Sequence, residues 1–270
     1  MKHDFPTNDR VRLELDEDGV ARVTMIRAEK RNALDMAMFD ALLAAGHALF
    51  ELSGLRCVVL AGEGKAFCAG LDLSVMQALH GEDAPRLPER THGNANLFQQ
   101  AALQWRKLPV PVIAAIHGAC MGGGLQIAGG ADMRVVSPDA RLSVLELKWG
   151  IVPDMGHFAL WRGHVREDVL RDLTYRHVEF SGSEAVDLGF ATIADADPLA
   201  RAMAMARDIA SKSPHAVRAA KALFNRTTGA ALDEVLLAES LEQHGLLGSR
   251  NQIEAVESQM AGRPPRFVDP

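Results

Sequence analysis

The sequence predicts an α/β fold that is followed by a helical C-terminal region. Short β-rich runs alternate with amphipathic helices up to about residue 195, and from residue 198 onward the pattern is helical throughout. Two glycine-bearing segments, 62–73 and 117–132, lie where a strand runs into a helix. We therefore expect residues 1–197 to form an α/β core and residues 198–270 to form a separate helical region.

The core elements follow from turn residues and apolar periodicity. Gly19 separates two alternating runs as a hairpin turn requires, Asp35 stands where a helix N-cap is expected, and Pro109 ends a helix. The elements expected in chain order are hairpin strands at 11–16 and 20–27, a helix at 36–52, a strand at 56–62, a helix at 72–80, a surface loop at 81–93, a helix at 94–107, a strand at 112–118, a helix at 123–129, and strands at 132–137 and 141–144.

The C-terminal region predicts three helices, at 198–212, 214–226 and 231–260, with Pro214 between the first two. The proline-rich end at 264–270 is expected to fray. A helical region that follows an α/β core is a candidate second layer or subunit contact.

Composition and charge exclude several classes of protein. The chain has 270 residues, 48% of them apolar and 24% charged, with a net charge of −6. The charges are interspersed, so the sequence offers neither a basic face for nucleic acid nor a polybasic membrane segment. No apolar run approaches the ~18 residues of a membrane span and the N-terminus lacks a signal-type stretch, so we expect a cytoplasmic protein. The three cysteines form no C-x-x-C pair, which argues against a disulfide framework and a metal site.

The two glycine segments do not match nucleotide-binding patterns. The segment GEGKAF lacks the spacing of a phosphate loop, and the dinucleotide pattern would need a third glycine. What remains in 117–132 is a strand, a glycine turn and a helix whose first N–H groups are unpaired and carry the positive end of the helix dipole. Such a turn stabilises an anionic oxygen. The simpler alternative is that Gly122 to Gly124 only allow close packing of strand and helix.

The glycine segments belong to a longer series of motifs. The series is NAL at 32–34, AFCAGLDL at 66–73, HGACMGGGLQIAGGAD at 117–132, ELKWGIVPDMG at 146–156 and FSGSEAVDLGF at 180–190. Together and in this order the motifs resemble the enoyl-CoA hydratase/isomerase (crotonase) family over most of the chain. The resemblance implies a crotonase-type spiral of ββα units and an acyl-CoA thioester substrate. It also implies C-terminal helices that form a homotrimer or hexamer and cover the active site. Coenzyme A is part of such a substrate, so no separate cofactor is implied.

The resemblance implies binding roles for two turns. The backbone N–H groups of Leu71 and Gly123 would form an oxyanion hole for the thioester oxygen. Contacts to the substrate are further implied for turn residues and nearby cations, namely Lys30, Arg31, Lys65, Cys68, Ala69, Gly70, Asp72 and Gly122. Simpler alternatives are surface charge for the cations, a packing role for Cys68 and a helix N-cap for Asp72.

The catalytic groups implied by the resemblance are Glu146, Asp154 and Gln126. Hydratases of this family use two glutamates, which correspond here to Gln126 and Glu146, and a glutamine cannot exchange a proton near neutral pH. Glu146 lies in an apolar stretch, so its pKa should be raised toward neutrality, as a proton shuttle requires. A salt bridge from Glu146 to Lys148 or Arg141 is the structural alternative.

Asp154 makes the reaction type an open choice. Dienoyl-CoA isomerases of the family have an aspartate at this place, a glutamate at the place of Glu146 and a third carboxylate at the place of Gln126, so this chain keeps two of the three. Glu146 and Asp154 could move a proton between two carbons of an enoyl or dienoyl thioester. A turn role after Pro153 is the alternative for Asp154. Isomerases with one carboxylate, at the position of Glu146, also match. His117 and His157 flank the motifs and are expected to be packed or surface residues.

The preferred interpretation is an acyl-CoA enzyme that polarises a thioester and moves a proton with Glu146, by enoyl-CoA isomerisation or hydration. A rival interpretation is a non-catalytic acyl-CoA-binding protein that lacks the carboxylate at the place of Gln126. A serine peptidase of the same broad fold is a weaker rival, because no serine occupies a convincing nucleophile turn near the glycines.

Overall fold

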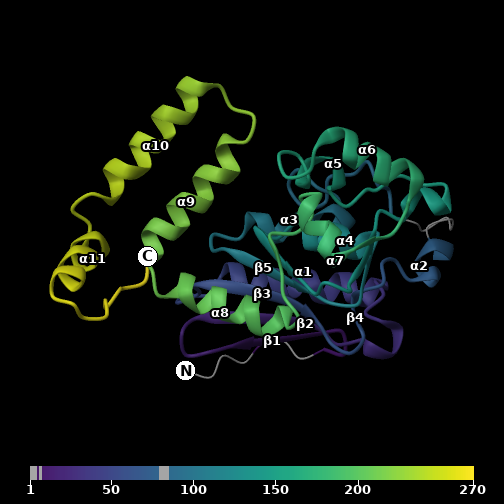
Figure 1. Ribbon diagram of the computed structural model, residues 1–270, viewed down its shortest axis with the longest axis horizontal. Helices are drawn as coiled ribbons and strands as arrows, with labels where there is room; N and C mark the ends of the chain where they lie inside the picture. The colour runs from purple at the N-terminus through teal and green to yellow at the C-terminus, as the bar shows by residue number, and fades with distance from the viewer. Residues whose placement is uncertain (1–4, 6–7, 79–84) are drawn as a thin grey trace.

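The computed structural model describes residues 5, 8–78 and 85–270. Two β-sheets form the centre of the body, and helices pack around them (Figure 1). The larger sheet has the strand order β1-β2-β3-β5-β7-β10, and the smaller one has the order β4-β6-β8-β9. This mixed α/β architecture confirms the fold class predicted from the sequence.

The larger sheet begins with the expected hairpin. Its strands are β1 (Val11–Leu15), β2 (Val20–Met25), β3 (Cys57–Gly62), β5 (Val112–Ile116), β7 (Met133–Val136) and β10 (Ile193–Ala194). Strands β1 and β2 pair antiparallel around Gly19, which has a φ of +79° that residues with a side chain rarely adopt. The remaining neighbours in this sheet pair in parallel.

The smaller sheet explains why the chain forms a spiral. Its strands are β4 (Ala66–Cys68), β6 (Ala119–Met121), β8 (Arg141–Ser143) and β9 (Phe180–Ser181). Each successive pair, β3 and β4, then β5 and β6, then β7 and β8, contributes one strand to each sheet. Since β4 and β6 pair in parallel, the two turns that follow them start from the same edge of the smaller sheet.

Helices cover the sheets and position the site. They are α1 (Met36–Phe50), α2 (Leu73–Ala78), α3 (Leu97–Lys107), α4 (Gly123–Gly129), α5 (His157–Leu160), α6 (Glu167–Arg176), α7 (Gly182–Asp187) and α8 (Pro198–Ala210), with 3₁₀ helices η1 (Ala28–Lys30) and η2 (Glu146–Trp149). Asp35 caps α1 by accepting from Met38 N at 2.8 Å, as predicted. Phe39 of α1 meets Phe98 of α3 edge to face, with ring centroids 4.9 Å apart.

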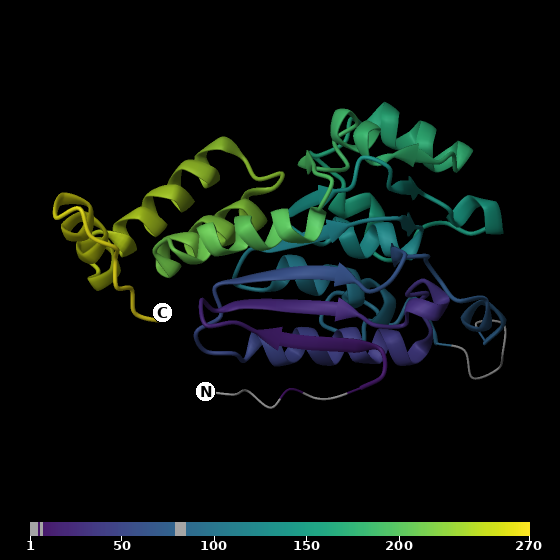
Figure 2. The same cartoon turned by 60° about the horizontal axis from the view of Figure 1, so that its bottom comes forward.

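The C-terminal helices divide differently from the prediction. Helix α8 packs on the larger sheet, where Ala202 and Ala206 join a cluster that contains Val59 and Ile113. Helices α9 (Pro214–Thr227), α10 (Leu232–Leu246) and α11 (Arg250–Met260) instead form an arm that projects from the body (Figures 1 and 2). The body therefore extends through α8, beyond residue 197.

Two expectations for the arm are wrong. The single helix predicted at 231–260 is broken between α10 and α11, where Gly248 takes a φ of +76° that a helix cannot contain. The C-terminal end is also held rather than frayed: Val268 N donates to Asn251 Oδ1 at 2.9 Å, and Asp269 Oδ2 accepts from Gly54 N at 2.7 Å.

Lys221 joins the arm to the body. Its ammonium group lies 2.8 Å from Asp132 Oδ2 and donates to Val110 O at 2.7 Å, and its side chain is only 4% exposed. A buried ammonium is tolerated only when it is paired in this way, so the start of the arm is fixed on the loops around β5.

The loop predicted at 81–93 is described only from residue 85, and the last two residues of the helix predicted at 72–80 also lie outside the described residues. Residues 85–93 contain neither helix nor strand, in agreement with a loop.

Among the described residues, no helix is both long and apolar enough to span a membrane.

Candidate active site

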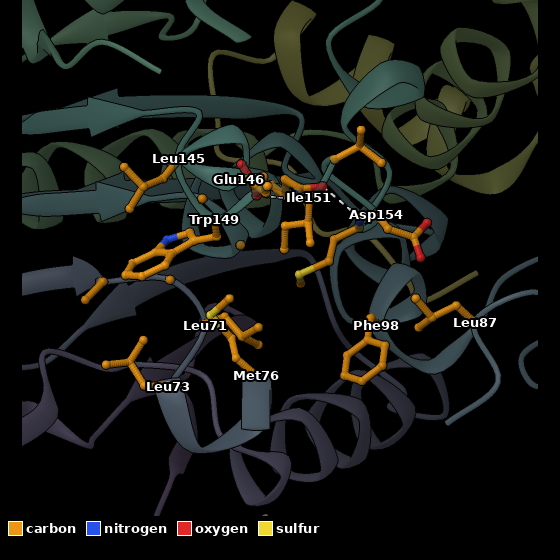
Figure 3. Close-up of a pocket in the computed structure, with 18 of the residues that line it drawn as sticks. Leu71, Leu73, Met76, Leu87, Phe98, Leu145, Glu146, Trp149, Ile151 and Asp154 are labelled. Atoms are coloured by element: carbon orange, nitrogen blue, oxygen red, sulfur yellow. Dashed lines mark hydrogen bonds between the residues drawn. The ribbon is translucent and has the colours of Figure 1, made fainter. Parts of the chain in front are cut away.

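A cavity of about 840 Å³ opens where the ends of β4 and β6 meet α2, α3 and η2 (Figure 3). Its walls are mainly apolar and include Leu73, Leu87, Phe98 and Trp149. Three polar side chains also line the cavity: Gln126, Glu146 and Asp154. A concave apolar site with a few convergent polar groups is the usual form of a small-molecule binding site.

The first predicted oxyanion donor, Leu71, lies in a turn that is held on both sides. Leu34 N donates to Gly70 O at 2.8 Å, and Leu34 O accepts from Asp72 N at 3.0 Å. Within the described part of the chain, the N–H of Leu71 has no acceptor of its own. The turn therefore presents one fixed, unused donor at the cavity wall.

The second predicted donor, Gly123, begins α4, where N–H groups have no partner within the helix. A Cβ on Gly70 would lie 3.8 Å from Gly123 N and only 2.8 Å from Met121 O, so the two turns are in contact and position 70 must be glycine. Leu71 and Gly123 both line the cavity. The structure thus brings the two turns together, as the oxyanion-hole prediction requires.

Glu146 is a buried carboxylate beside these turns. It is 8% exposed, and a Cβ placed on Gly122 would lie 3.3 Å from its Oε1. Burial raises the pKa of Glu146, while the hydrogen bond from Gln126 opposes that rise. The alternative of a salt bridge is wrong, because Arg141 pairs with Glu179 and no described cation pairs with Glu146. Its Oε2 is buried and has no hydrogen-bond partner among the described residues.

Both ends of the Gln126 amide are occupied. Its Oε1 accepts from Met155 N at 2.7 Å, and its Nε2 donates to Glu146 Oε1 at 2.5 Å. Because a backbone N–H can only donate, the oxygen must face Met155 and the NH₂ group must face Glu146. Gln126 thus holds the carboxylate in place, and as an amide it cannot act as a general base toward a water.

Asp154 is held by two amides from the start of α3. Its Oδ1 accepts from Gln99 Nε2 at 2.6 Å, and its Oδ2 accepts from Asn96 Nδ2 at 3.1 Å. In Figure 3 Asp154 lies on the side of Leu87, well apart from Glu146. These partners are far from Asp154 in sequence, so the carboxylate does more than close a local turn. The sequence analysis missed Asn96 and Gln99, although their capping-box spacing before an apolar helix was visible.

Three predicted cations lie on neighbouring turns beside the oxyanion turn. Lys30, Arg31 and Lys65 are exposed and make no ion pair with any described residue. The turn that carries Lys30 and Arg31 contacts the turn that carries Lys65, since a Cβ on Gly64 would lie 2.8 Å from Ala28 Cβ. Arg31 O also accepts from the N–H of Ala69, which lines the cavity, so the cations border the cavity turn.

Cys68 and Asp72 have structural roles. Cys68 is fully buried, its Sγ donates to Asn32 O at 3.1 Å, and burial raises its pKa to about 12. Its side chain does not line the cavity, so the predicted substrate contact is replaced by packing. Asp72 accepts from Ser74 N at 3.0 Å and from Arg27 Nη1 at 2.7 Å. The bonds from Ser74 make the largest contribution, and together with the bond from Arg27 they lower the pKa of Asp72 to about 2. Its position before α2 supports the N-cap alternative.

The two flanking histidines do not line the cavity, as expected. His117 Nε2 donates to Gly64 O at 3.0 Å. His157 is 1% exposed beside Thr174 Oγ1 at 3.1 Å, and burial lowers its pKa to about 4. Among the described residues, no group of histidine, cysteine and acidic side chains could hold a metal ion.

The arm does not cover the cavity of its own chain. The described lining residues lie between Phe39 and Met155, and Figure 1 shows α9 to α11 on the side of the body opposite α2. The covering role predicted for residues 198–270 is therefore not met within one chain.

The chain is similar to known proteins over most of its length. The model of the enoyl-CoA hydratase/isomerase family matches residues 16–269. The peroxisomal Δ(3,5)-Δ(2,4)-dienoyl-CoA isomerase of Arabidopsis thaliana is 32% identical over 98% of both chains. The mitochondrial enzyme of that name from Mus musculus is 30% identical over 92% of this chain and 79% of its own. A probable enoyl-CoA hydratase of Bacillus subtilis is 29% identical over 94% of this chain and 98% of its own.

Solved structures are similar over almost the whole chain. A putative enoyl-CoA hydratase/isomerase from Mycobacterium abscessus superposes with a TM-score of 0.87 at 29% identity, over 96% of this chain and 99% of its own. A putative enoyl-CoA hydratase from Streptomyces coelicolor gives 0.87 at 27% identity, over 99% of this chain and 98% of its own.

Proposed function

Because this chain belongs to the enoyl-CoA hydratase/isomerase family, we propose that it isomerises a dienoyl-CoA thioester by moving a proton along the acyl chain. The observation that carries this proposal is the presence of two carboxylates, Glu146 and Asp154, lying apart along one apolar cavity. Relatives named Δ(3,5)-Δ(2,4)-dienoyl-CoA isomerase support the choice of substrate.

The chemistry of such an isomerisation needs two proton-exchanging groups. When a 3,5-diene becomes a 2,4-diene, C2 loses a proton, both double bonds move one carbon toward the thioester, and C6 gains a proton. The charge that develops in between is spread over a dienolate whose thioester oxygen is held by the N–H groups of Leu71 and Gly123. No oxidant, reductant or water is consumed.

The order of the groups along the cavity supports a role for each carboxylate at one of the two carbons. Glu146 lies against Gly122, next to the proposed oxyanion donor Gly123, which suits a group that takes the proton from C2, the carbon beside the thioester. Asp154 lies further along the cavity, on the side of Leu87, which suits a group that exchanges the proton at C6. Since one carboxylate takes a proton while the other gives one, the active pair carries a single proton.

Gln126 argues against hydration as the main reaction. Adding water across a double bond in the two-glutamate manner needs a second proton-exchanging group beside Glu146, and an amide cannot supply it. Both ends of the Gln126 amide are already used by Met155 N and Glu146.

The protein also has surfaces that suit the rest of the substrate. The apolar walls fit an acyl chain, and the free cations Lys30, Arg31 and Lys65 beside the oxyanion turn fit the phosphates of coenzyme A. Coenzyme A is then part of the substrate, and the proposed reaction needs no separate cofactor.

We also propose that the arm forms a homotrimer or a hexamer. Its helices expose large apolar side chains, including Phe224 at 78%, Leu237 at 61% and Met260 at 84%. Patches of this kind are expensive to leave in water and mark protein–protein contacts. In such an assembly, a neighbouring subunit would cover the cavity.

An activity panel tests the proposed reaction. The purified protein is given a 3,5-dienoyl-CoA, a 3-enoyl-CoA and a 2-enoyl-CoA, and the ultraviolet absorbance of each thioester is followed. We expect a conjugated 2,4-dienoyl thioester to form from the first substrate at the highest kcat/KM. Hydration of the 2-enoyl-CoA without dienoyl isomerisation would overturn the proposal. Calorimetric binding of CoA esters with no turnover would favour the non-catalytic rival.

A further inference from the structure

We infer that Gln99, itself held by Arg90, is a positioning residue that sets the orientation of the Asp154 carboxylate. The inference rests on the proposed function, in which Asp154 exchanges a proton with the acyl chain. Gln99 does not line the cavity, so it acts through Asp154 rather than on the substrate.

The orientation of the Gln99 amide is fixed by its neighbours. Its Oε1 accepts from Asn96 N at 3.1 Å and from Arg90 Nη1 at 2.8 Å. Both of these partners can only donate, so the oxygen faces them and the NH₂ group must face Asp154, where Nε2 lies 2.6 Å from Oδ1. Hydrogen bonds to a carboxylate favour its charged form.

Arg90 links the same amide to the cavity wall. Its Nη2 donates to Leu87 O at 2.8 Å and its Nε donates to Pro88 O at 3.0 Å, while its third bond goes to Gln99. Leu87 lines the cavity. One guanidinium therefore fixes both the loop that contacts the acyl chain and the amide that orients Asp154.

The two carboxylates are held in different ways. Burial raises the pKa of Glu146, whereas Asp154 is half-buried and both of its oxygens accept from amide donors. In the proposed reaction Asp154 exchanges a proton with the acyl chain, so its carboxyl group must give up or regain the bond from Gln99 as it does so. Removing the Gln99 donor therefore alters the proton exchange at Asp154.

Other charged groups around Asp154 do not replace the hydrogen bond from Gln99. The charged or titratable side chains on the elements beside it are Arg86, Glu89 and Arg90 on the loop, Glu146 and Lys148 on η2, His157 at the start of α5, and Arg106 and Lys107 at the far end of α3. Arg86 and Glu89 pair with each other at 3.4 Å. Burial lowers the pKa of His157 to about 4, which keeps it neutral at the pH of the assay.

The test is the pH dependence of dienoyl-CoA turnover in Gln99→Glu. A glutamate at this position keeps the acceptor oxygen for Asn96 N and for Arg90, and it is a favoured residue at the third position of a helix, so α3 should form normally. It removes the donor to Asp154 and adds a like charge beside it. We expect the pH optimum to rise by about one unit or more, with kcat down ~10-fold at the wild-type optimum and restored at the new one.

Matched variants separate this role from a general structural one. Arg90→Met should shift the optimum upward by less, because Asn96 N still holds Gln99, and should raise KM through the Leu87 wall. Arg86→Met removes an exposed arginine of the same loop and should leave the profile unchanged. A Gln99→Glu profile that superposes on the wild type, or a loss of kcat that no pH restores, would overturn the inference.

A separate variant reports on the proposed function itself. Asp154→Asn should abolish dienoyl-CoA turnover while CoA-ester binding persists. If Asp154→Asn keeps full activity, the proposed proton transfer is wrong. If it is inactive but Gln99→Glu leaves the pH optimum in place, the proposed function stands and only the positioning role of Gln99 falls.

Discussion

Gln126 and Glu146 form a fixed pair in which Nε2 of the amide donates to Oε1 of the carboxylate over 2.5 Å. The amide cannot turn around, because its oxygen accepts from Met155 N. The bond leaves Oε2 of Glu146 as the oxygen without a partner, and Glu146 lines the cavity. An amide at this place therefore orients a single base instead of joining it in acid–base chemistry.

Replacing Glu146 by glutamine should remove turnover and leave binding intact. Glu146→Gln keeps the size of the side chain and an acceptor for Gln126, but it cannot carry the proton. General acid–base catalysis is typically worth ~10²–10⁴-fold, so we expect a loss of that size in kcat with a nearly unchanged Kd for a CoA ester. Stopped-assay rates and calorimetry measure the two quantities. Wild-type turnover in this variant would remove Glu146 from the mechanism.

The same variant should be more stable than the wild type, in a pH-dependent way. The folded-state pKa of Glu146 is raised above its ordinary value of 4.5 by burial, so the protein binds this proton more tightly when folded. Folding stability therefore falls as pH rises from 4.5 through the raised pKa. Glu146→Gln avoids that loss, so its Tm should exceed the wild-type Tm at pH 8, and the difference should shrink toward pH 5. Scanning calorimetry at both pH values checks this, and an equal difference at both would contradict it.

Gln126→Glu should introduce hydration. It places a second carboxyl group beside Glu146, and because the two lie within hydrogen-bond reach they would share a proton. We expect measurable hydration of a 2-enoyl-CoA, absent in the wild type, and a lower rate of dienoyl isomerisation. Gln126→Leu serves as the control, since it removes the bond to Glu146 without adding an acid and should lower isomerisation only. Hydration by both variants, or by neither, would show that Gln126 does not select the reaction.

Gly70 should be required for the oxyanion turn. An alanine there must adopt a φ of +91° and would place its Cβ 2.8 Å from Met121 O, so the turn that carries Leu71 has to move. Loss of one oxyanion donor typically costs ~10²–10³ in rate, which is the decrease in kcat expected for Gly70→Ala.

Gly54→Ala is the matched control for Gly70→Ala. Gly54 has a φ of +78°, but a Cβ on it meets nothing within 4 Å. It should lower Tm through backbone strain alone and keep normal kcat. Equal activities of the two variants would mean that the turn tolerates displacement.

Local patterns predicted most of the fold. The hairpin around Gly19 and the cap at Asp35 depend on residues close in sequence, and both formed as expected. The strands β4 and β6 were missed because each is short and lies inside a glycine segment that was interpreted as a turn before a helix. The break at Gly248 was missed because an isolated glycine is tolerated within a helical pattern and only its φ of +76° reveals the turn.

The site was predictable where the residues themselves carry the chemistry. Glu146 stood out as an acid in an apolar stretch, and its burial followed. Asn96 and Gln99 could not be assigned, because their role depends on a contact with Asp154 that forms only when α3 packs against the segment after η2. For the same reason the sequence left Asp154 as a possible turn residue.

The arm should hold the subunits together. On a single chain, Phe224 of α9 is 78% exposed and Leu237 of α10 is 61% exposed, and burying a side chain of this kind is worth about 1.5–3 kcal/mol. Phe224→Asp with Leu237→Asp would place two charges in the proposed contact and should shift the protein from a trimer or hexamer to a monomer in light scattering. Tyr175→Asp, at an aromatic residue on α6 that is 61% exposed, tests whether any apolar surface has this effect. A monomeric wild type, or an unchanged mass in the double variant, would contradict assembly through the arm.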